Sequence, residues 1–404
     1  MAGMASEAPR PAPEFRRRGT EFLRRFGQGD LGSLRVVIAI AVIWAIFQAQ
    51  QSRFLTATNL TNLVLQITAI GLISVGVVLV LLLGEIDLSV GAVSGLCAAV
   101  TAVLSAQHGW SPYLAIAAGV LAGAFIGLLQ GFITDFFDIP SFVVTLAGLL
   151  AWQGFLLEVL GSTGSVNITD PTITGLANTF YSDAVGWIIA VVGVGAYAGS
   201  KLLRRYRRVR AGLPGGELPA LLAQIVLVSA AVIASVAVLN SDRGVPLAAL
   251  ILVGFVLVFQ YVTTRTPAGR HIFALGGNTE AARRAGISQR RVRLAVFMIA
   301  GTMAAIGGLL AASRLLAVNQ SSGGSDLLLL AIAGPVVAGT SLFGGRGSVW
   351  SALLGAVVIG SISNGLDLLA LASAIKFIVT GAVLIVAVAV DAVARKQRAA
   401  RGRI

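Results

Sequence analysis

The sequence is poor in the side chains from which metal centres and disulfide frameworks are built. Its 404 residues include one cysteine, Cys97, and two histidines, His108 and His271. A single cysteine can form neither an internal disulfide nor a thiolate cage, and neither histidine has a metal-ligand neighbour in the sequence. We therefore expect no metal site.

Phosphate-binding and nucleophile motifs are also missing. The chain has three lysines, Lys201, Lys376 and Lys396, and none follows glycine or precedes serine or threonine. This excludes the G-x-x-x-x-G-K-[ST] loop that cradles nucleotide phosphates, and no G-x-S-x-G elbow is present. The sequence thus predicts no enzyme activity and no cofactor in this chain. Any ATP hydrolysis would require a separate polypeptide.

Charged residues are scarce, at 12 % of the chain, whereas hydrophobic residues make up 56 % and the mean hydropathy is +0.89. A water-soluble domain with a solvated surface could hardly tolerate this composition. We predict an all-α, polytopic integral membrane protein with about 10–12 transmembrane helices. The predicted spans fall near 34–50, 62–83, 86–106, 112–134, 139–160, 184–200, 218–239, 245–262, 292–313, 326–343, 348–371 and 374–392.

The third and tenth spans are the least regular. Span 86–106 is rich in glycine, and span 326–343 is interrupted by Pro335. Irregular backbone at membrane depth is tolerated where protein covers it or where it lines a cavity. Broken or re-entrant segments are therefore expected here.

The basic residues, which give a net charge of +13 and a pI near 11.2, are grouped between the spans. Of the 30 Lys and Arg, 26 lie in alternate connections or in the two end segments, and only Arg53, Arg243 and Arg314 lie in the other connections. This asymmetry follows the positive-inside rule and predicts cytoplasmic N- and C-termini. It does not resemble the basic face of a nucleic-acid-binding protein.

The domain organisation follows from these patterns. We expect one transmembrane domain over 34–392, between a flexible basic cytoplasmic tail at 1–33 and a second basic tail at 393–404. The connections with a predicted side are an external loop at 161–183, a basic cytoplasmic loop at 201–217 and a longer cytoplasmic loop at 263–293.

A short helix is predicted within the loop 263–293. Gly276 and Gly277 would give a flexible entry, Asn278 can cap the first turn, and Gly286 can adopt the left-handed conformation that stops a helix. Two turns of helix are marginal in water, because isolated helices need roughly 12–15 residues. The helix should therefore pack against something. A basic loop that only follows the positive-inside rule is the alternative.

Two carboxylates interrupt the apolar stretch LLLGEIDLSVGAVSG at 81–95. An ionised carboxylate facing lipid costs several kcal/mol, so Glu85 and Asp87 must face a partner, a cavity or an interface. They could belong to a pathway-lining helix break, or Asp87 could cap the next span at the cytoplasmic membrane edge through the amides of residues 89–90. Ser89 and Asn364 are further polar candidates for a pathway or helix-break role.

Four motifs then carry a family resemblance. EIDLSVG (85–91), IPSFVVTLAG (139–148), GGNTEAARRAGI (276–287) and GTSLFGGRGSV (339–349) occur in an order that resembles the membrane permeases of the ribose/xylose class of ABC sugar importers. The likeness covers roughly residues 55–392. Glu85 and the RGVP sequence that starts at Arg243 favour the xylose branch. The stretch 326–342 departs from it, because leucines replace acidic residues there.

The resemblance implies a function and partners. It implies a permease subunit of the bacterial inner membrane that moves D-xylose or a related pentose by alternating access. The permease would work as a homodimer. Its partners would be a cytoplasmic ABC ATPase, which holds ATP and Mg, and a periplasmic or surface-anchored sugar-binding protein. The coupling residues to the ATPase would be Gly276, Gly277, Asn278, Glu280, Ala281, Ala282, Gly286 and Ile287.

Other functions remain open at this point. Within the family, the solute could be ribose, another sugar or a non-sugar. A secondary transporter or channel would need no ATPase, and an intramembrane enzyme would need a catalytic pair at membrane depth, which the sequence does not provide.

Overall fold

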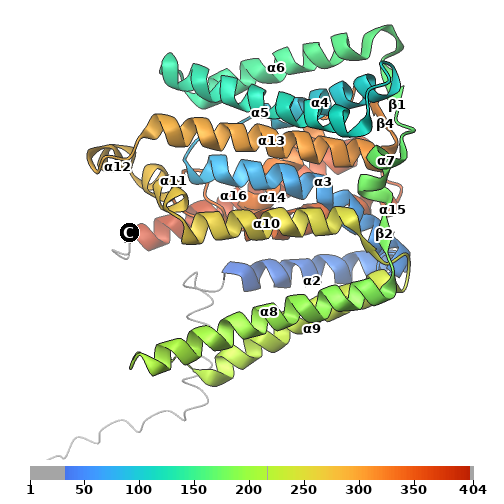
Figure 1. The fold of residues 1–404 in the computed structure, drawn as a ribbon. Helices are drawn as coiled ribbons and strands as arrows, with labels where there is room; N and C mark the ends of the chain where they lie inside the picture. The colour runs from blue at the N-terminus through green and yellow to red at the C-terminus, as the bar shows by residue number, and fades with distance from the viewer. Residues whose placement is uncertain (1–31, 216, 401–404) are drawn as a thin grey trace, which may run out of the picture.

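The computed structural model describes residues 32–215 and 217–400, most of which form α-helices (Figure 1). The long helices are α2 (Gly32–Gln50), α3 (Ala57–Leu82), α4 (Val90–Ala106), α5 (Pro112–Phe136), α6 (Ser141–Leu160), α8 (Asp183–Arg210), α9 (Leu218–Asn240), α10 (Leu247–Arg265), α13 (Gln289–Leu315), α14 (Ser325–Val337), α15 (Trp350–Leu368) and α16 (Ser373–Ala400). The short elements are η1 (Gly161–Thr163), β1 (Ser165–Asn167), α7 (Pro171–Asn178), β2 (Phe180–Tyr181), β3 (Val245–Pro246), α11 (Pro267–Gly277), α12 (Thr279–Arg284) and β4 (Ala317–Asn319).

Each predicted span coincides with one long helix. In the described part of the chain, eight helices are long and apolar enough to cross a membrane, and four more apolar helices are shorter. The tenth span is the least accurate prediction, because α14 ends at Val337 and residues 338–343 are not helical.

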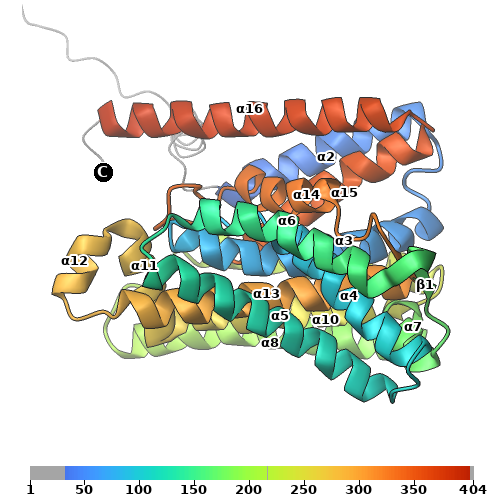
Figure 2. The same cartoon turned by 90° about the horizontal axis from the view of Figure 1, so that it is seen from above.

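The bundle is built around α3. In its most apolar stretch, 89 % of the residues are buried, which is the highest share among the candidate spans. α13 and α15 both pack against it, and α13 also packs against α5 and α4 (Figure 2). Small residues allow the close approach: a β-carbon built on Gly301 of α13 would lie 2.1 Å from the carbonyl oxygen of Gly123 of α5.

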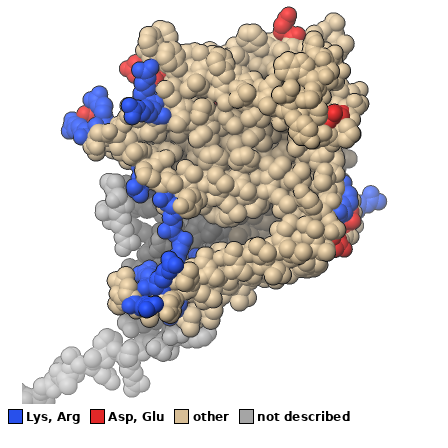
Figure 3. Space-filling view, in the orientation of Figure 1, with Lys and Arg blue, Asp and Glu red and all other residues tan. Residues whose placement is uncertain are grey.

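The bundle has two distinct ends (Figure 1). The α12 end carries α11, α12 and the last turns of α16 and α8, and Figure 3 shows basic side chains gathered there. The α7 end carries α7 and two small antiparallel pairings, β1 with β4 and β2 with β3.

The connections are more ordered than the sequence predicts. Segment 161–183 contains α7 and two strands, segment 201–217 is helical as far as Arg210, and segment 263–293 consists largely of helices. Residues 393–400 continue α16. The predicted tail 1–33 falls almost wholly outside the described residues, as do the last four residues of the chain.

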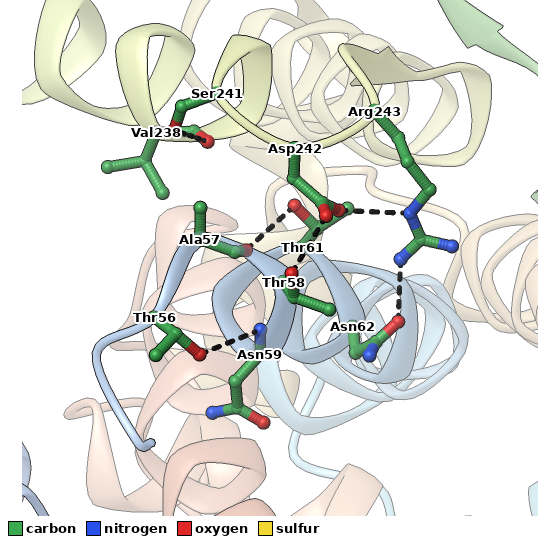
Figure 4. Close-up of polar contacts among 10 residues, drawn as sticks. All are labelled: Thr56, Ala57, Thr58, Asn59, Thr61, Asn62, Val238, Ser241, Asp242 and Arg243. Atoms are coloured by element: carbon green, nitrogen blue, oxygen red, sulfur yellow. Dashed lines mark hydrogen bonds and ion pairs between the residues drawn. The ribbon is translucent and has the colours of Figure 1, made fainter. Parts of the chain in front are cut away.

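Helices α8 and α9 form a hairpin whose attachment to the bundle includes a polar cluster at the α7 end (Figure 4). The Asp242 carboxylate accepts a hydrogen bond of 2.9 Å from Thr58 and pairs with Arg243 at 2.9 Å, and Arg243 donates to Asn62 at 2.6 Å. Desolvation tends to raise the pKa of Asp242, but hydrogen bonds from Arg243, Thr58 and Thr61 hold it below its ordinary value. The cluster therefore ties the α9–α10 turn to the first turns of α3.

Helices α4 and α14 are shorter than the eight candidate spans. They have 17 and 13 residues, or about 26 and 20 Å at the rise of an α-helix, against a hydrocarbon core of about 30 Å. Their starts meet inside the bundle, because a β-carbon built on Gly95 of α4 would lie 2.1 Å from the carbonyl oxygen of Ser322, just before α14. Pro335 lies inside α14, two residues before its end.

Candidate functional site

Three glycine backbones meet at the α12 end, where α3 finishes. Gly84 adopts a φ of +83° two residues after α3, Gly276 is the second-last residue of α11, and Gly344 belongs to the loop between α14 and α15. Their contact is close enough that a β-carbon on Gly276 would lie 1.9 Å from the carbonyl oxygen of Leu82. The amide of Gly345 donates to that same carbonyl at 3.0 Å. We call this contact the glycine junction.

The non-helical segment 84–89 between α3 and α4 is held from the other side by α6. The amide of Ile86 donates to the Ser141 hydroxyl and the amide of Leu88 donates to the Thr145 hydroxyl, both at 3.1 Å. These bonds satisfy backbone groups that leave the helical pattern at depth. All four sequence motifs therefore converge on one place, although they are spread over more than 250 residues.

Asp87 is buried in the bundle. Its carboxylate accepts hydrogen bonds from the amide of Ser89 at 2.8 Å and from the Ser89 hydroxyl at 2.7 Å. Ser89 and Gln130 of α5 in turn contact each other at 2.9 Å. Asp87 thus orders the start of α4 through residue 89, as the capping interpretation expects, although no bond to residue 90 forms part of this set.

The Glu85 side chain forms an ion pair with Arg293. Arg293 of α13 donates to one Glu85 carboxylate oxygen at 2.6 and 3.0 Å, and its second terminal nitrogen lies 3.4 Å from Asp135 at the end of α5. The Arg293 and Glu85 side chains are only 12 % and 17 % exposed. Arg290 also reaches Asp135, at 3.5 Å. This ion-pair cluster ties the first turns of α13 to the α3–α4 break and to α5.

Helix α12 has the predicted form. The Asn278 side chain accepts a 2.9 Å hydrogen bond from the amide of Ala281, and Gly286 has a φ of +82° after the last turn. Glu280 pairs with Arg283 at 2.9 Å and with Arg284 at 3.0 Å. Ala282 is buried against the cluster that includes α11, which explains how so short a helix persists.

The expected coupling residues in and around α12 fall into two groups by their exposure to solvent. Gly277, Asn278, Glu280, Ala281 and Gly286 are exposed, whereas Gly276, Ala282 and Ile287 face the protein to differing degrees. Gly276 and Gly277 are the last residues of α11 and not a flexible entry. α12 is therefore an exposed knob on a rigid base.

The fourth pathway candidate is far from the other three. Asn364 of α15 pairs with Asn59 in the first turn of α3, with side-chain distances of 2.8 and 3.2 Å, near the α7 end. Glu85, Asp87 and Ser89 lie at the α3–α4 break. Asn364 therefore joins two helices and belongs to no common site with the carboxylates.

A cavity of about 750 Å³ lies toward the α7 end, among α3, α4, α13, α14, α15 and α16. Its walls carry Gln66, Arg314, Asp326, Ser363, Asp367 and Lys376 among many small and apolar residues. Lys376 forms an ion pair with Asp367. None of these was predicted as a site residue, although four of them are charged groups in or at the ends of apolar helices.

Arg293 and the glycines of the 343–347 loop were also missed. Arg293 is the last residue of the predicted cytoplasmic loop 263–293, and a cation at the start of a span was the available signal. Its partner Glu85 lies 208 residues away, and no local pattern indicates such a pairing.

Comparison with known proteins assigns the chain to a family. A family described as the permease component of branched-chain amino acid transport systems matches residues 59–388. The chain belongs to this permease family. No solved structure matches it.

Curated relatives of the permease have sugar-related names. The xylose transport system permease protein of Escherichia coli is 37 % identical over 369 residues, which are 90 % of this chain and 93 % of the relative. The Haemophilus influenzae protein of that name is 33 % identical over 363 residues, 90 % of this chain and 96 % of the relative. The ribose import permease protein of Escherichia coli is 30 % identical over 368 residues, 91 % of this chain and 96 % of the relative.

Proposed function

We propose that the permease is the membrane subunit of an ATP-binding cassette importer that carries D-xylose or a related pentose across the bacterial inner membrane. It works as a homodimer, with an ATPase on its cytoplasmic side and a sugar-binding protein on the external side. The α12 end, with the start of α2 and the end of α16, faces the cytoplasm, and ATP and Mg are held by the ATPase.

One observation carries the coupling role: α12 is exposed, and its base is locked to the bundle at two points. The glycine junction joins α11 to α3 and to the loop before α15, and Arg293 joins α13 to the α3–α4 break. A load on the Ala281 face of α12 is therefore transmitted to α3, α4, α5 and α13. Tilting of these helices would exchange the outward-facing gate for the inward-facing one.

The solute assignment rests on the relatives. The family description names branched-chain amino acids, whereas the relatives that align over nine-tenths of this chain are named for xylose and ribose. Glu85 and the 243–246 turn favour xylose over ribose. The leucine-rich α14, where this chain departs from the xylose branch, borders the cavity at Asp326 and Leu330.

Reconstitution tests the proposal. The permease, its ATPase and its binding protein are placed in liposomes, and uptake of labelled D-xylose is measured with and without ATP. We expect ATP-dependent uptake that falls to background in Ala281→Trp, because the bulky side chain blocks the exposed face of α12. Ala211→Trp, another exposed residue after α8 at the same end, is the matched control and should transport normally.

Two outcomes would contradict the proposal. Uptake that persists without ATP, and is unaffected by Ala281→Trp, would identify a secondary transporter or channel. ATP-dependent uptake of leucine and not of pentoses would leave the coupling role intact and refute the solute.

A further inference from the structure

The cavity near the α7 end combines a size and a location suited to a small solute. Its volume of about 750 Å³ falls within the range of ligand pockets, roughly 300–1,000 Å³. The first turns of α4 and of α14 border it, through Ser94, Gly95, Gly324 and Asp326. Short helices that start inside a membrane bundle commonly surround solute sites in transporters.

Polar side chains project into this cavity from helices that are otherwise apolar. Gln66 belongs to the most buried span, and Arg314 lies in the last turn of α13. Among the described residues, neither side chain forms a hydrogen bond or an ion pair. Gln66 lies within an apolar span, where a polar group is costly unless it has a function or a partner. Arg314 is exposed and follows the predicted span 292–313.

We propose that this cavity is a low-affinity binding site for a neutral monosaccharide, with Arg314 and Gln66 as hydrogen-bond donors to sugar hydroxyls. The inference rests on the proposed function and adds to it a solute site within the permease itself. The Lys376–Asp367 pair supplies a donor and an acceptor from the opposite wall, and Ser363 adds a hydroxyl.

The charge balance favours an uncharged solute. Two cations, Arg314 and Lys376, and two anions, Asp326 and Asp367, line the cavity, so its formal charge is zero. Donors and acceptors come from α3, α13, α14, α15 and α16, on several sides of the space. A ring with hydroxyls in several directions suits this distribution, whereas a simple anion or cation would be repelled by the two lining charges of its own sign.

Protection of a reporter cysteine tests the site. Ser363→Cys places a thiol in the cavity, while the native Cys97 is buried. The complete permease–ATPase complex in nanodiscs is labelled with a membrane-impermeant thiol reagent against increasing D-xylose. We expect D-xylose to slow labelling at millimolar concentration, and Arg314→Gln to raise the required concentration about tenfold or more, since it removes a charged donor.

Controls separate the site from general damage. Arg53→Gln removes an exposed arginine outside the cavity and should leave protection unchanged. Arg314→Lys should recover part of the protection, and Gln66→Leu gives a second test if Arg314→Gln does not yield a monodisperse complex.

The outcomes are distinct. No protection by D-xylose, or equal protection in Arg314→Gln, overturns the site. Protection by L-leucine instead of D-xylose overturns the sugar assignment. If ATP-dependent xylose uptake persists while protection is absent, only this inference fails; if uptake is absent as well, the proposed function fails too.

Discussion

Gly276 and Gly277 are neighbours with opposite steric surroundings. A β-carbon at 276 would lie 1.9 Å from a backbone oxygen of Leu82, whereas nothing lies within 4 Å of one at 277. We predict that Gly276→Ala destabilises the permease by about 1–3 kcal/mol, because rigid backbones must separate. Gly277→Ala should be neutral or slightly stabilising. Thermal unfolding in detergent measures both, and equal melting temperatures would refute the junction.

The Glu85–Arg293 ion pair can be tested by a single substitution. Glu85→Gln removes the main partner of Arg293 and leaves it only Asp135, at 3.4 Å. Leaving a largely buried cation half-paired should cost up to about 3 kcal/mol and lower the sugar transported per ATP hydrolysed. The exchange Glu85→Arg with Arg293→Glu restores one pair but meets Asp135, so it should recover coupling only in part. Unchanged coupling in Glu85→Gln would make the pair merely structural.

At the scale of elements, α12 depends on its cap. Asn278→Ala removes the hydrogen bond to the Ala281 amide and should destabilise the helix by about 1 kcal/mol, while Asn278→Ser should retain most of it. Hydrogen exchange of the amides of residues 281–285 measures this directly. Equal protection in both variants would show that packing of Ala282 alone holds the helix.

The elements also show where sequence reasoning works. Asn278 and Gly286 were identified as the limits of α12 because capping and the left-handed stop are local chemistry. The prediction that Gly276 gives a flexible entry was wrong. A side chain is excluded at Gly276 by the backbone of Leu82, which lies almost 200 residues earlier in the sequence. For the same reason Arg293 could not be identified, since its partners Glu85 and Asp135 come from the α3–α4 break and from α5.

For the whole molecule, hydropathy located each of the twelve long helices in the described part of the chain, because a segment that crosses lipid must be apolar along its length. The glycines of 86–106 and Pro335 predicted broken or re-entrant segments at α4 and α14, but no local pattern indicated that α4 meets the loop before α14. That meeting depends on the close contact of Gly91 and Gly95 with the 322–324 loop. The cavity beside them could not be predicted from the sequence either, because its walls come from six helices.

Orientation is the remaining property of the whole molecule, and thiol labelling can establish it. Basic side chains gather at the α12 end, so the positive-inside rule places that end in the cytoplasm. Ser52→Cys lies in the exposed turn between α2 and α3 near the α7 end, and Ala211→Cys follows α8 at the other end. In right-side-out membrane vesicles, an impermeant maleimide should label Ser52→Cys and not Ala211→Cys, and inside-out vesicles should reverse the result. The unsubstituted chain should remain unlabelled in both, because Cys97 is buried; labelling of Ala211→Cys from outside would invert the whole assignment of partners to the two ends.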